Sequence, residues 1–219
     1  MENTGNKPRI TYFYDAICGW CYGFSPVMAR LYEDFKEEIN FEIVSGGLAL
    51  GKKAGPIDQM APYIKAGAYK DVEKMSGVKF GDAFVNGTLQ KGEMVLNSEP
   101  PAIALSIVKE HRPEQAIPFG GLLHKAVYFD GMEPEDIAGY GKYAAETGLD
   151  EQEFTRMMGE ARYLEKARED FQQSAVAGVG GFPTLMLSYG GKSYIISRGY
   201  AAYEALAPAL RKFLAESAM

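Results

Sequence analysis

The first 50 residues follow a strand pattern, then a helix pattern, then a second strand pattern. Residues 10–14 are a run of β-branched and aromatic side chains, which is typical of a buried strand. From about residue 21, Val27, Leu31 and Phe35 recur at helical spacing with charged residues between them. A second apolar run, residues 41–44, ends at two glycines. Because strand–helix–strand crossovers are right-handed, this segment predicts a parallel βαβ unit.

The middle of the chain, residues 54–160, changes to helical patterns separated by glycine and proline. Ser98, followed by Glu99 and two prolines, is typical of a helix start with serine as the N-cap. This helix is expected to run to about residue 108. Further helices are predicted over residues 119–129, 135–147 and 151–158, whereas the glycine-rich segment 77–92 has no assignable pattern.

The end of the chain returns to strands. A helix is predicted over residues 161–176, and two strands, 184–189 and 192–197, flank Gly190-Gly191, a strong hairpin turn. A last amphipathic helix covers residues 201–216. The two ends therefore predict one α/β domain with a mixed four-stranded sheet, made of residues 1–53 and 161–219. Residues 54–160 form a helical insertion between its two halves.

Composition narrows the classes of protein that fit. The 219 residues are 47% hydrophobic and 24% charged, which is ordinary for a soluble globular protein. A formal net charge of −6 argues against nucleic acid as the main partner. There is no run of about 18 apolar residues that would span a membrane. The polar start of the chain lacks the pattern of a secretory signal, so we expect a cytoplasmic protein. The sequence gives no prediction of oligomeric state.

The only two cysteines, Cys18 and Cys21, lie at the junction between the first predicted strand and the first predicted helix. Two cysteines are too few for a disulfide scaffold, and a bridge across so short a loop would stabilise little. A zinc site needs four ligands, and the two histidines lack the usual short spacing. The pair therefore predicts a dithiol that opens and closes as a disulfide, with no metal and no organic cofactor.

The predicted helix N-terminus gives the two cysteines different roles. It favours an anion, so we expect Cys18 to be an exposed, attacking thiolate and Cys21, one turn further in, to be the buried resolving thiol. Gly19 and Trp20 would tune the pair, and Trp20 either packs in the core or forms a rim that touches substrate. Asp15 has three interpretations: a proton relay, a like charge that opposes the thiolate, or a turn residue at the strand end.

A second motif lies far downstream, in the glycine-rich segment 178–184 that contains Phe182 and Pro183. Cis peptide bonds in proteins occur almost only at the bond that precedes a proline. A cis bond here would turn the backbone of Phe182 outward, so that a substrate peptide could pair with it as an extra strand and place its sulfur beside Cys18. The alternative is an ordinary trans proline at a strand start.

The two motifs resemble those of a known family. The stretch from Asp15 through Cys18-Gly19-Trp20-Cys21 to Pro26 is similar to the active-site start of the DsbA family of thiol oxidoreductases, in the thioredoxin-like superfamily. Residues 178–185 resemble that family's cis-proline loop. Ser98-Glu99-Pro100 resembles a segment of its cytoplasmic, FrnE-like branch.

The resemblance implies a thioredoxin-like fold with a helical insertion between the βαβ and ββα halves, and it implies a cis Pro183. It makes Cys18 the attacking and Cys21 the resolving cysteine. Trp20, Phe24, Phe182 and Pro183 are expected to bind substrate. One departure matters: Gly-Trp stands between the cysteines where the periplasmic oxidase carries Pro-His, so strongly oxidising behaviour does not carry over.

We therefore expect a cytoplasmic protein-disulfide oxidoreductase that exchanges disulfides with cysteine-containing proteins or peptides. Glutathione is an alternative co-substrate, which Lys52 and Lys53 after the second strand would attract unless they form a solvated loop. Two rivals stay open. One is a glutathione-dependent isomerase or transferase of the kappa-like group, in which a serine stands at the position of Cys18. The other is a non-enzymatic holdase that binds peptides in a groove around Trp20, Phe24 and Phe182.

Overall fold

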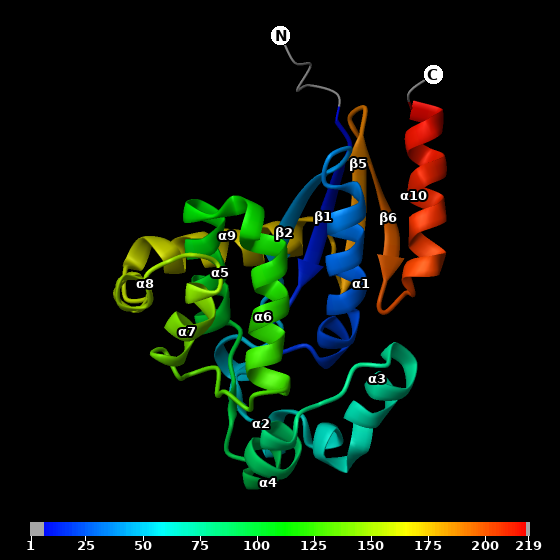
Figure 1. The fold of residues 1–219 in the computed structure, drawn as a ribbon. Coiled ribbons are helices and arrows are strands. Elements are labelled where there is room, and N and C mark those ends of the chain that lie inside the picture. The colour runs from blue at the N-terminus through cyan, green and yellow to red at the C-terminus, as the bar shows by residue number, and fades with distance from the viewer. Residues whose placement is uncertain (1–6, 218–219) are drawn as a thin grey trace.

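A computed structural model describes residues 7–217 and contains a mixed four-stranded sheet at its centre (Figure 1). Its strands are β1 (Arg9–Tyr14), β2 (Asn40–Ser45), β5 (Thr184–Tyr189) and β6 (Lys192–Arg198), in the order β2-β1-β5-β6. β1 is parallel to β2 and antiparallel to β5, and β5 is antiparallel to β6. The predicted α/β, thioredoxin-like fold with a helical insertion before the last two strands is confirmed.

The central strand β1 is buried along almost its whole length, as its run of apolar side chains predicts. Tyr12 pairs with Ile43 of β2 on one side and with Leu185 of β5 on the other. At the hairpin between β5 and β6, Gly190 and Gly191 both have positive φ, 56° and 76°, which only glycine adopts readily.

Helices α1 (Gly19–Phe35), α9 (Ala161–Val176) and α10 (Tyr203–Ser217) pack on the sheet, and α6 (Ala116–Tyr128) also contacts β2. Figure 1 shows α1 crossing in front of the strands and α9 passing behind them. α1 begins at Gly19, earlier than predicted, because Cys18 already acts as the N-cap and its carbonyl accepts from the N–H of Tyr22 at 3.1 Å. The apolar face of α1 turns toward the sheet and the insertion.

The segment between β2 and α9 is mostly helical, with one element that the sequence pattern missed. A two-stranded ribbon joins β3 (Gly55–Pro56) to β4 (Val95–Leu96). Two residues a strand are too few to show alternation. The remaining elements are η1 (Gly51–Lys53), α2 (Ile57–Met60), η2 (Ile64–Ala68), α3 (Tyr69–Ser76), η3 (Ala83–Thr88), α4 (Leu89–Lys91), α5 (Glu99–His111), η4 (Pro113–Gln115), α6 (Ala116–Tyr128), α7 (Gly139–Ala145) and α8 (Glu151–Met157).

The predicted start of α5 is confirmed, since Ser98 lies at the N-cap and proline follows in the first turn. The Ser98 hydroxyl makes no capping hydrogen bond, because it is bonded to groups outside the helix. α7 begins at Gly139 rather than near residue 135, since Asp136 closes a turn there by accepting from the N–H of Gly139 at 3.1 Å. The domain boundaries at residues 53/54 and 160/161 stay a prediction.

The buried side chains form two hydrophobic clusters. The larger joins the sheet to α1, α5, α6 and α10. The smaller lies at the N-terminal end of α1, where Ile17 meets Val72 and Phe80 of the insertion and Tyr128 at the end of α6. α1 and α3 approach closely, because a Cβ added at Gly23 would lie 2.7 Å from the side chain of Val72. The smaller cluster therefore holds the insertion against the start of α1.

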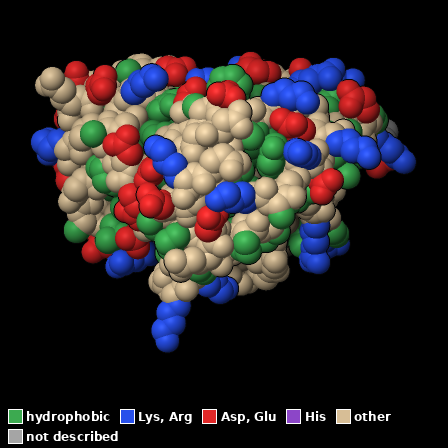
Figure 2. Space-filling view, turned by 90° about the horizontal axis from the view of Figure 1, so that it is seen from below, with side chains coloured by type: hydrophobic (Ala, Val, Ile, Leu, Met, Phe, Trp, Pro, Cys, Tyr) green, Lys and Arg blue, Asp and Glu red, His purple; other side chains and the backbone are tan. Residues whose placement is uncertain are grey.

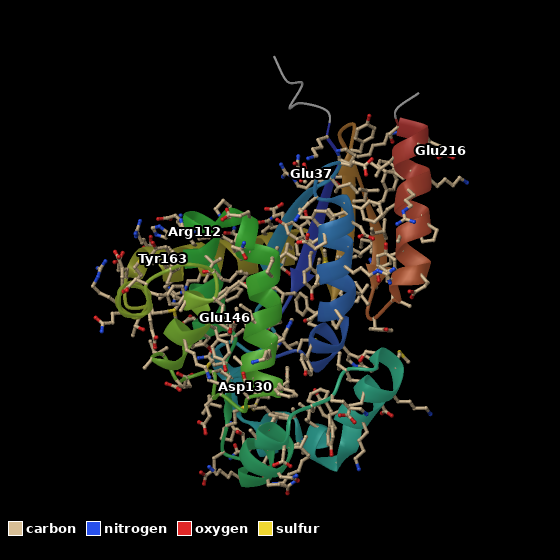
Figure 3. All side chains as sticks on the ribbon, viewed as in Figure 1. Glu37, Arg112, Asp130, Glu146, Tyr163 and Glu216 are labelled. Atoms are coloured by element: carbon tan, nitrogen blue, oxygen red, sulfur yellow. The ribbon has the colours of Figure 1, made fainter. Side chains whose placement is uncertain are left out.

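The outer surface carries both signs of charge. Seen from below, Figure 2 shows Lys and Arg interspersed with Asp and Glu, with hydrophobic groups between them. Tyr163, labelled in Figure 3, donates its hydroxyl to Glu110, which also accepts from Arg162 and is paired with Lys166. Within residues 7–217, no helix is long and apolar enough to cross a membrane.

Candidate active site

The two cysteines lie at the start of α1, both as free thiols. Cys18 has extended backbone angles, φ −94° and ψ 111°, and its N–H donates to the carbonyl of Asp15 at 3.0 Å. Cys21, in the first turn of the helix, is fully buried, whereas Cys18 is 8% exposed. The expectation of an exposed Cys18 is thus wrong in degree: most of its side chain is covered, and its accessible edge lies in the wall of a cavity.

The carbonyl of Phe182 faces Cys18 from the loop before β5. The Phe182–Pro183 peptide bond is cis, and the thiol of Cys18 donates to the Phe182 carbonyl oxygen at 3.5 Å. The ring of Phe182 turns the other way and covers Gly46, so closely that an added Cβ at Gly46 would lie 2.1 Å from the ring. Phe182 therefore presents its backbone to Cys18 and its side chain to the end of β2.

Asp15 is a buried carboxylate that ties three segments together beneath Cys18. Its Oδ1 accepts from the N–H of Ile17 at 3.1 Å and from the hydroxyl of Ser98 at 3.0 Å. Its Oδ2 accepts from the N–H of Leu48 at 2.7 Å. Burial raises the pKa of this carboxyl above its usual range, and the hydrogen bonds from Leu48, Ile17 and Ser98 offset part of that shift. Among the three interpretations of Asp15, these contacts favour a structural anchor of the turn that carries Cys18.

His124 of α6, which sequence reasoning missed, supports the same turn from the other side. Its Nε2 donates to the carbonyl of Asp15 at 3.0 Å, and its Nδ1 lies 2.7 Å from the hydroxyl of Ser25. Burial lowers the pKa of His124 to about 4, so the ring is neutral at pH 7. Because a carbonyl only accepts, Nε2 carries the proton, and Nδ1 accepts from Ser25. The ring thus links the turn before Cys18 to Ser25, whose oxygen is also 3.1 Å from the carbonyl of Cys21.

The buried thiol of Cys21 and two buried tyrosines, Tyr12 and Tyr128, complete the site. Burial and the nearby Cys18 raise the pKa of the Cys21 thiol well above its ordinary value, so Cys21 stays protonated until it reacts. Tyr12 lies next to Cys21, and burial together with the two sulfurs raises the pKa of its phenol. Tyr128 donates its hydroxyl to the carbonyl of Ile17, which fixes the residue before Cys18.

A cavity of about 500 Å³, including its open mouth, adjoins Cys18 between the start of α1 and the insertion. From the β1–α1 junction it is lined by Ile17, Cys18, Gly19 and Trp20. The other lining residues are Leu48, Tyr63, Ile64, Ala68, Tyr69, Val72, Phe80 and Tyr128. We call this space the apolar cavity. In Figure 1 the insertion helices α2, α3 and α4 lie beneath the N-terminal end of α1, which is where these two sets of residues meet.

The structure brings some of the expected site residues to the cavity and not others. Gly19 and Trp20 line it. Trp20 is half-buried against both hydrophobic clusters, which agrees in part with core packing, and its contact with substrate stays a prediction. Phe24 is fully buried and packs between Tyr12 and Tyr200, so we no longer place it in contact with substrate. The helical spacing of apolar residues indicates that Phe24 lies in the core, because buried side chains recur on α1 at 21, 24, 28, 31 and 35.

Charged residues do not line the apolar cavity. Lys52 and Lys53 form the exposed turn η1 and are absent from its wall. Asp130, labelled in Figure 3 near the lower end of α6, accepts instead from Lys125 and Tyr143, each at 2.8 Å. Within residues 7–217, no group of three or more His, Cys, Asp or Glu side chains is placed to hold a metal ion.

With this geometry in view, comparison with known proteins identifies the family. The family model of the DSBA-like thioredoxin domain matches residues 9–211. The chain belongs to the DSBA-like thioredoxin domain family. Its Cys18–Cys21 pair is the C-x-x-C pair of a DsbA-like oxidoreductase. No curated protein matches the sequence.

Solved structures of several DsbA-like and related proteins share the fold. A candidate protein disulfide isomerase from Nitrosomonas europaea is 25% identical, with a TM-score of 0.82 over 96% of this chain and 98% of its own. The cytosolic disulfide reductase DsbM from Pseudomonas aeruginosa is 24% identical, with a TM-score of 0.77 over 95% and 97%; it has also been solved with GSH. A 2-hydroxychromene-2-carboxylate isomerase is 15% identical, with a TM-score of 0.66 over 96% and 98%.

Proposed function

We propose that this DsbA-like protein is a cytoplasmic thiol–disulfide oxidoreductase that exchanges disulfides with cysteine-containing proteins or peptides. The observation that carries the proposal is the arrangement of two thiols of unequal access beside the backbone carbonyl of Phe182. Cys18 is partly accessible, Cys21 is buried directly behind it, and the carbonyl of Phe182 lies 3.5 Å from the sulfur of Cys18. The cytosolic location named for DsbM supports the compartment.

The chemistry follows from this order of access. In the direction of substrate oxidation, a substrate thiolate attacks the Cys18 sulfur of the enzyme disulfide and Cys21 leaves as a thiolate, which takes up a proton. A second substrate thiolate then attacks the substrate sulfur of the mixed disulfide and expels Cys18. In the direction of substrate reduction, the Cys18 thiolate attacks the substrate disulfide, and Cys21 resolves the mixed disulfide. The backbone of Phe182 would hold the substrate chain as an added strand during both steps.

The proposal is tested by equilibrating the protein with graded mixtures of reduced and oxidised glutathione. Thiol alkylation and the fluorescence of Trp20 report the oxidised fraction of Cys18 and Cys21. A reversible two-electron transition supports the proposal. A midpoint well above the cytosolic poise of the glutathione pool would make the protein a disulfide donor, and a midpoint at or below it a reductase. The absence of any reversible transition would overturn the redox function.

The roles of the two thiols are tested separately by trapping. Cys21→Ser should accumulate a mixed disulfide on Cys18, because the resolving sulfur is gone, whereas Cys18→Ser should form none. The two variants are matched in size and chemistry. Mass spectrometry after addition of a peptide disulfide distinguishes them, and trapping on Cys21 rather than Cys18 would reverse the assignment.

The isomerase fold match gives one second candidate, a glutathione-dependent isomerase or transferase. The intact pair of thiols argues against it, since such an enzyme needs the thiol of glutathione rather than a protein dithiol. Glutathione-dependent activity that survives Cys18→Ser would favour this candidate. Its loss in Cys18→Ser, together with a reversible dithiol transition, would favour the oxidoreductase, for which glutathione is then an alternative co-substrate.

A further inference from the structure

The apolar cavity differs from the rest of the site in having a side-chain lining without charge. It opens beside the sulfur of Cys18. Its walls come from the start of α1, from residues 63–80 of the insertion, and from Leu48 and Tyr128. The backbone of Phe182 faces Cys18 from the loop before β5 and is not part of the cavity wall. A substrate sulfur that reaches Cys18 therefore brings its neighbouring groups to the mouth of this cavity.

The charged residues closest to the cavity wall are engaged elsewhere. Lys65 is paired with Asp58 at 2.9 Å. Glu73 accepts from the backbone of Phe80 at 2.9 Å and is paired with Lys79. Lys70 is exposed, and its Nζ lies 5.8 Å from the centroid of the Tyr69 ring. The cavity thus offers a buried carboxylate no side-chain partner in its wall, and burying a charge without a partner is costly.

The size and wall of the cavity suit a single apolar side chain. About 110 Å³ of this space is open to water-sized groups, less than the roughly 300–1,000 Å³ of small-molecule pockets, so the cavity suits one side chain rather than a whole ligand. Tyr63 is 63% exposed and forms the rim, while Val72 and Phe80 are buried and form the floor. Such a pocket stabilises an aromatic or branched aliphatic group by removing its apolar surface from water. It offers no stabilising contact to a charged group.

On these grounds we propose that the apolar cavity is a specificity pocket for an apolar side chain that flanks the reacting cysteine of a peptide substrate. The inference rests on the proposed function and names its substrate class: peptide disulfides with neutral, apolar flanking residues, in preference to acidic peptides and to glutathione disulfide. Glutathione carries two carboxylates and no apolar side chain, so it exchanges through its sulfur without filling the pocket.

The exchange step itself is balanced without any other reactant. The Cys18 thiolate attacks one sulfur of the peptide disulfide, the sulfur–sulfur bond breaks, and one peptide thiolate leaves and takes up a proton. Cys21, losing its proton, attacks the Cys18 sulfur and expels the second peptide thiolate. The enzyme dithiol is oxidised to its disulfide, and the peptide disulfide is reduced to two thiols. The flanking side chain occupies the pocket in the first step.

The test compares four symmetric disulfides as oxidants of the reduced protein. Three are the blocked tripeptides acetyl-Phe-Cys-Phe-amide, acetyl-Gly-Cys-Gly-amide and acetyl-Asp-Cys-Asp-amide, and the fourth is glutathione disulfide. Each rate is divided by the rate of the same disulfide with N-acetylcysteine, which removes differences in intrinsic reactivity. We expect the normalised rate of the Phe peptide to exceed the other three by roughly tenfold or more, because its ring is buried in the first step.

Two substitutions locate the preference in the cavity. Ala68 lines the cavity, and Ala66, two positions earlier in η2, is exposed outside it. Ala68→Phe should reduce the preference for the Phe peptide to within about twofold, because the new ring fills the space that the substrate ring needs. The matched control Ala66→Phe should keep the preference. Ala68→Lys should raise the relative rate of the Asp peptide by placing a cation at the wall.

Every outcome decides the inference. Exchange with none of the disulfides would overturn the proposed function itself. Equal normalised rates for all four, or a faster rate with glutathione disulfide, would leave that function intact and overturn the specificity pocket. A preference for the Phe peptide that a folded Ala68→Phe variant retains would also overturn it. Were the Ala68 variants to misfold, the comparison of the four disulfides on the unaltered protein would still decide.

Discussion

The hydroxyl of Ser98 donates to Oδ1 of Asp15 at 3.0 Å, across 83 positions of sequence. The same hydroxyl oxygen accepts from the N–H of Ala49 at 2.9 Å. Ser98 thereby connects the start of α5 to the chain after β2 and to the turn before Cys18. One buried oxygen atom joins the insertion to the part of the thioredoxin-like fold that carries Cys18.

Ser98→Ala removes both hydrogen bonds at once. The variant leaves the buried N–H of Ala49 without its acceptor and Asp15 with one donor fewer, so we expect the free energy of unfolding to fall by about 1–3 kcal/mol. The matched control is Ser106→Ala, whose buried hydroxyl donates only to the carbonyl of Ala102 within α5. Its loss should cost less than about 1 kcal/mol. Urea unfolding measures both, and equal losses would contradict the role of Ser98.

The four strands of the central sheet and the two motifs of the site could be predicted because their signals are local. The apolar run of β1, the glycines of the β5–β6 hairpin and the Cys18–Cys21 spacing each need only a few neighbouring residues. The partners of Asp15 could not be predicted in this way. Ser98 and His124 reach it from 83 and 109 positions away, and no periodicity records which buried polar groups will meet.

The apolar cavity could not be predicted from local sequence patterns either. Its insertion side comes from residues 63–80, where η2 is kinked at Gly67 with φ +118° and no regular helical period is maintained. Phe24 is the opposite case: it is buried at helical spacing with Cys21, Met28 and Leu31 on α1, whereas the family resemblance implied that it binds substrate. Packing followed the spacing.

His124 should make stability depend on pH in a defined window. Its pKa is lowered by burial from 6.5 to about 4, so the unfolded state binds the proton more tightly. The neutral ring of His124 therefore makes its full contribution to the free energy of unfolding above pH 6.5. As the pH falls toward 4, about 3 kcal/mol of that free energy is lost. Asp15, with a raised pKa, acts in the opposite sense: the stability that its shift adds at low pH is lost as the pH rises.

His124→Gln isolates the histidine, because the amide can still donate to the carbonyl of Asp15 and does not titrate. Between pH 7.5 and pH 5, we expect the unaltered protein to lose about 2 kcal/mol more than the variant. Urea unfolding at pH 7.5, 6 and 5 measures both curves. Parallel curves would show that His124 is not the titrating group in this window.

Gly46 is expected to control the reach of Phe182. A methyl group at Gly46 would meet the Phe182 ring at 2.1 Å, so Gly46→Ala should push the ring and move the Phe182 carbonyl away from Cys18. We expect the exchange rate with N-acetylcysteine disulfide to fall roughly tenfold or more, since displacements of about an ångström have effects of this size. The control is Gly180→Ala. Gly180 lies in the loop that contains Phe182, but a Cβ added there would have no atom within 4 Å, so this variant should exchange at the parent rate. A Gly46→Ala protein that exchanges normally would mean that the ring moves without its carbonyl.

Tyr12 is expected to assist the departure and return of the Cys21 thiolate. Its hydroxyl is fully buried next to Cys21, has no hydrogen-bond partner among residues 7–217 and stays protonated, because its pKa is raised by burial. Cys21 also has a raised pKa, so forming its thiolate to resolve a mixed disulfide is costly. A phenol that donates to this thiolate lowers that cost. Hydrogen bonds to charged groups contribute about 1.5–3 kcal/mol, which corresponds to tenfold or more in rate.

Tyr12→Phe should therefore prolong the mixed disulfide on Cys18 by roughly tenfold while leaving the free energy of unfolding unchanged or higher, since an unpaired buried hydroxyl is removed. Quenched-flow alkylation and mass spectrometry measure the lifetime of the mixed disulfide. Tyr14→Phe is the matched control: Tyr14 is equally buried on the same strand and also has an unpaired hydroxyl, which lies close to the hydroxyl of Ser45 in β2. Equal lifetimes in the two variants would mean that the phenol of Tyr12 is a packing group and that Cys21 loses its proton by another route.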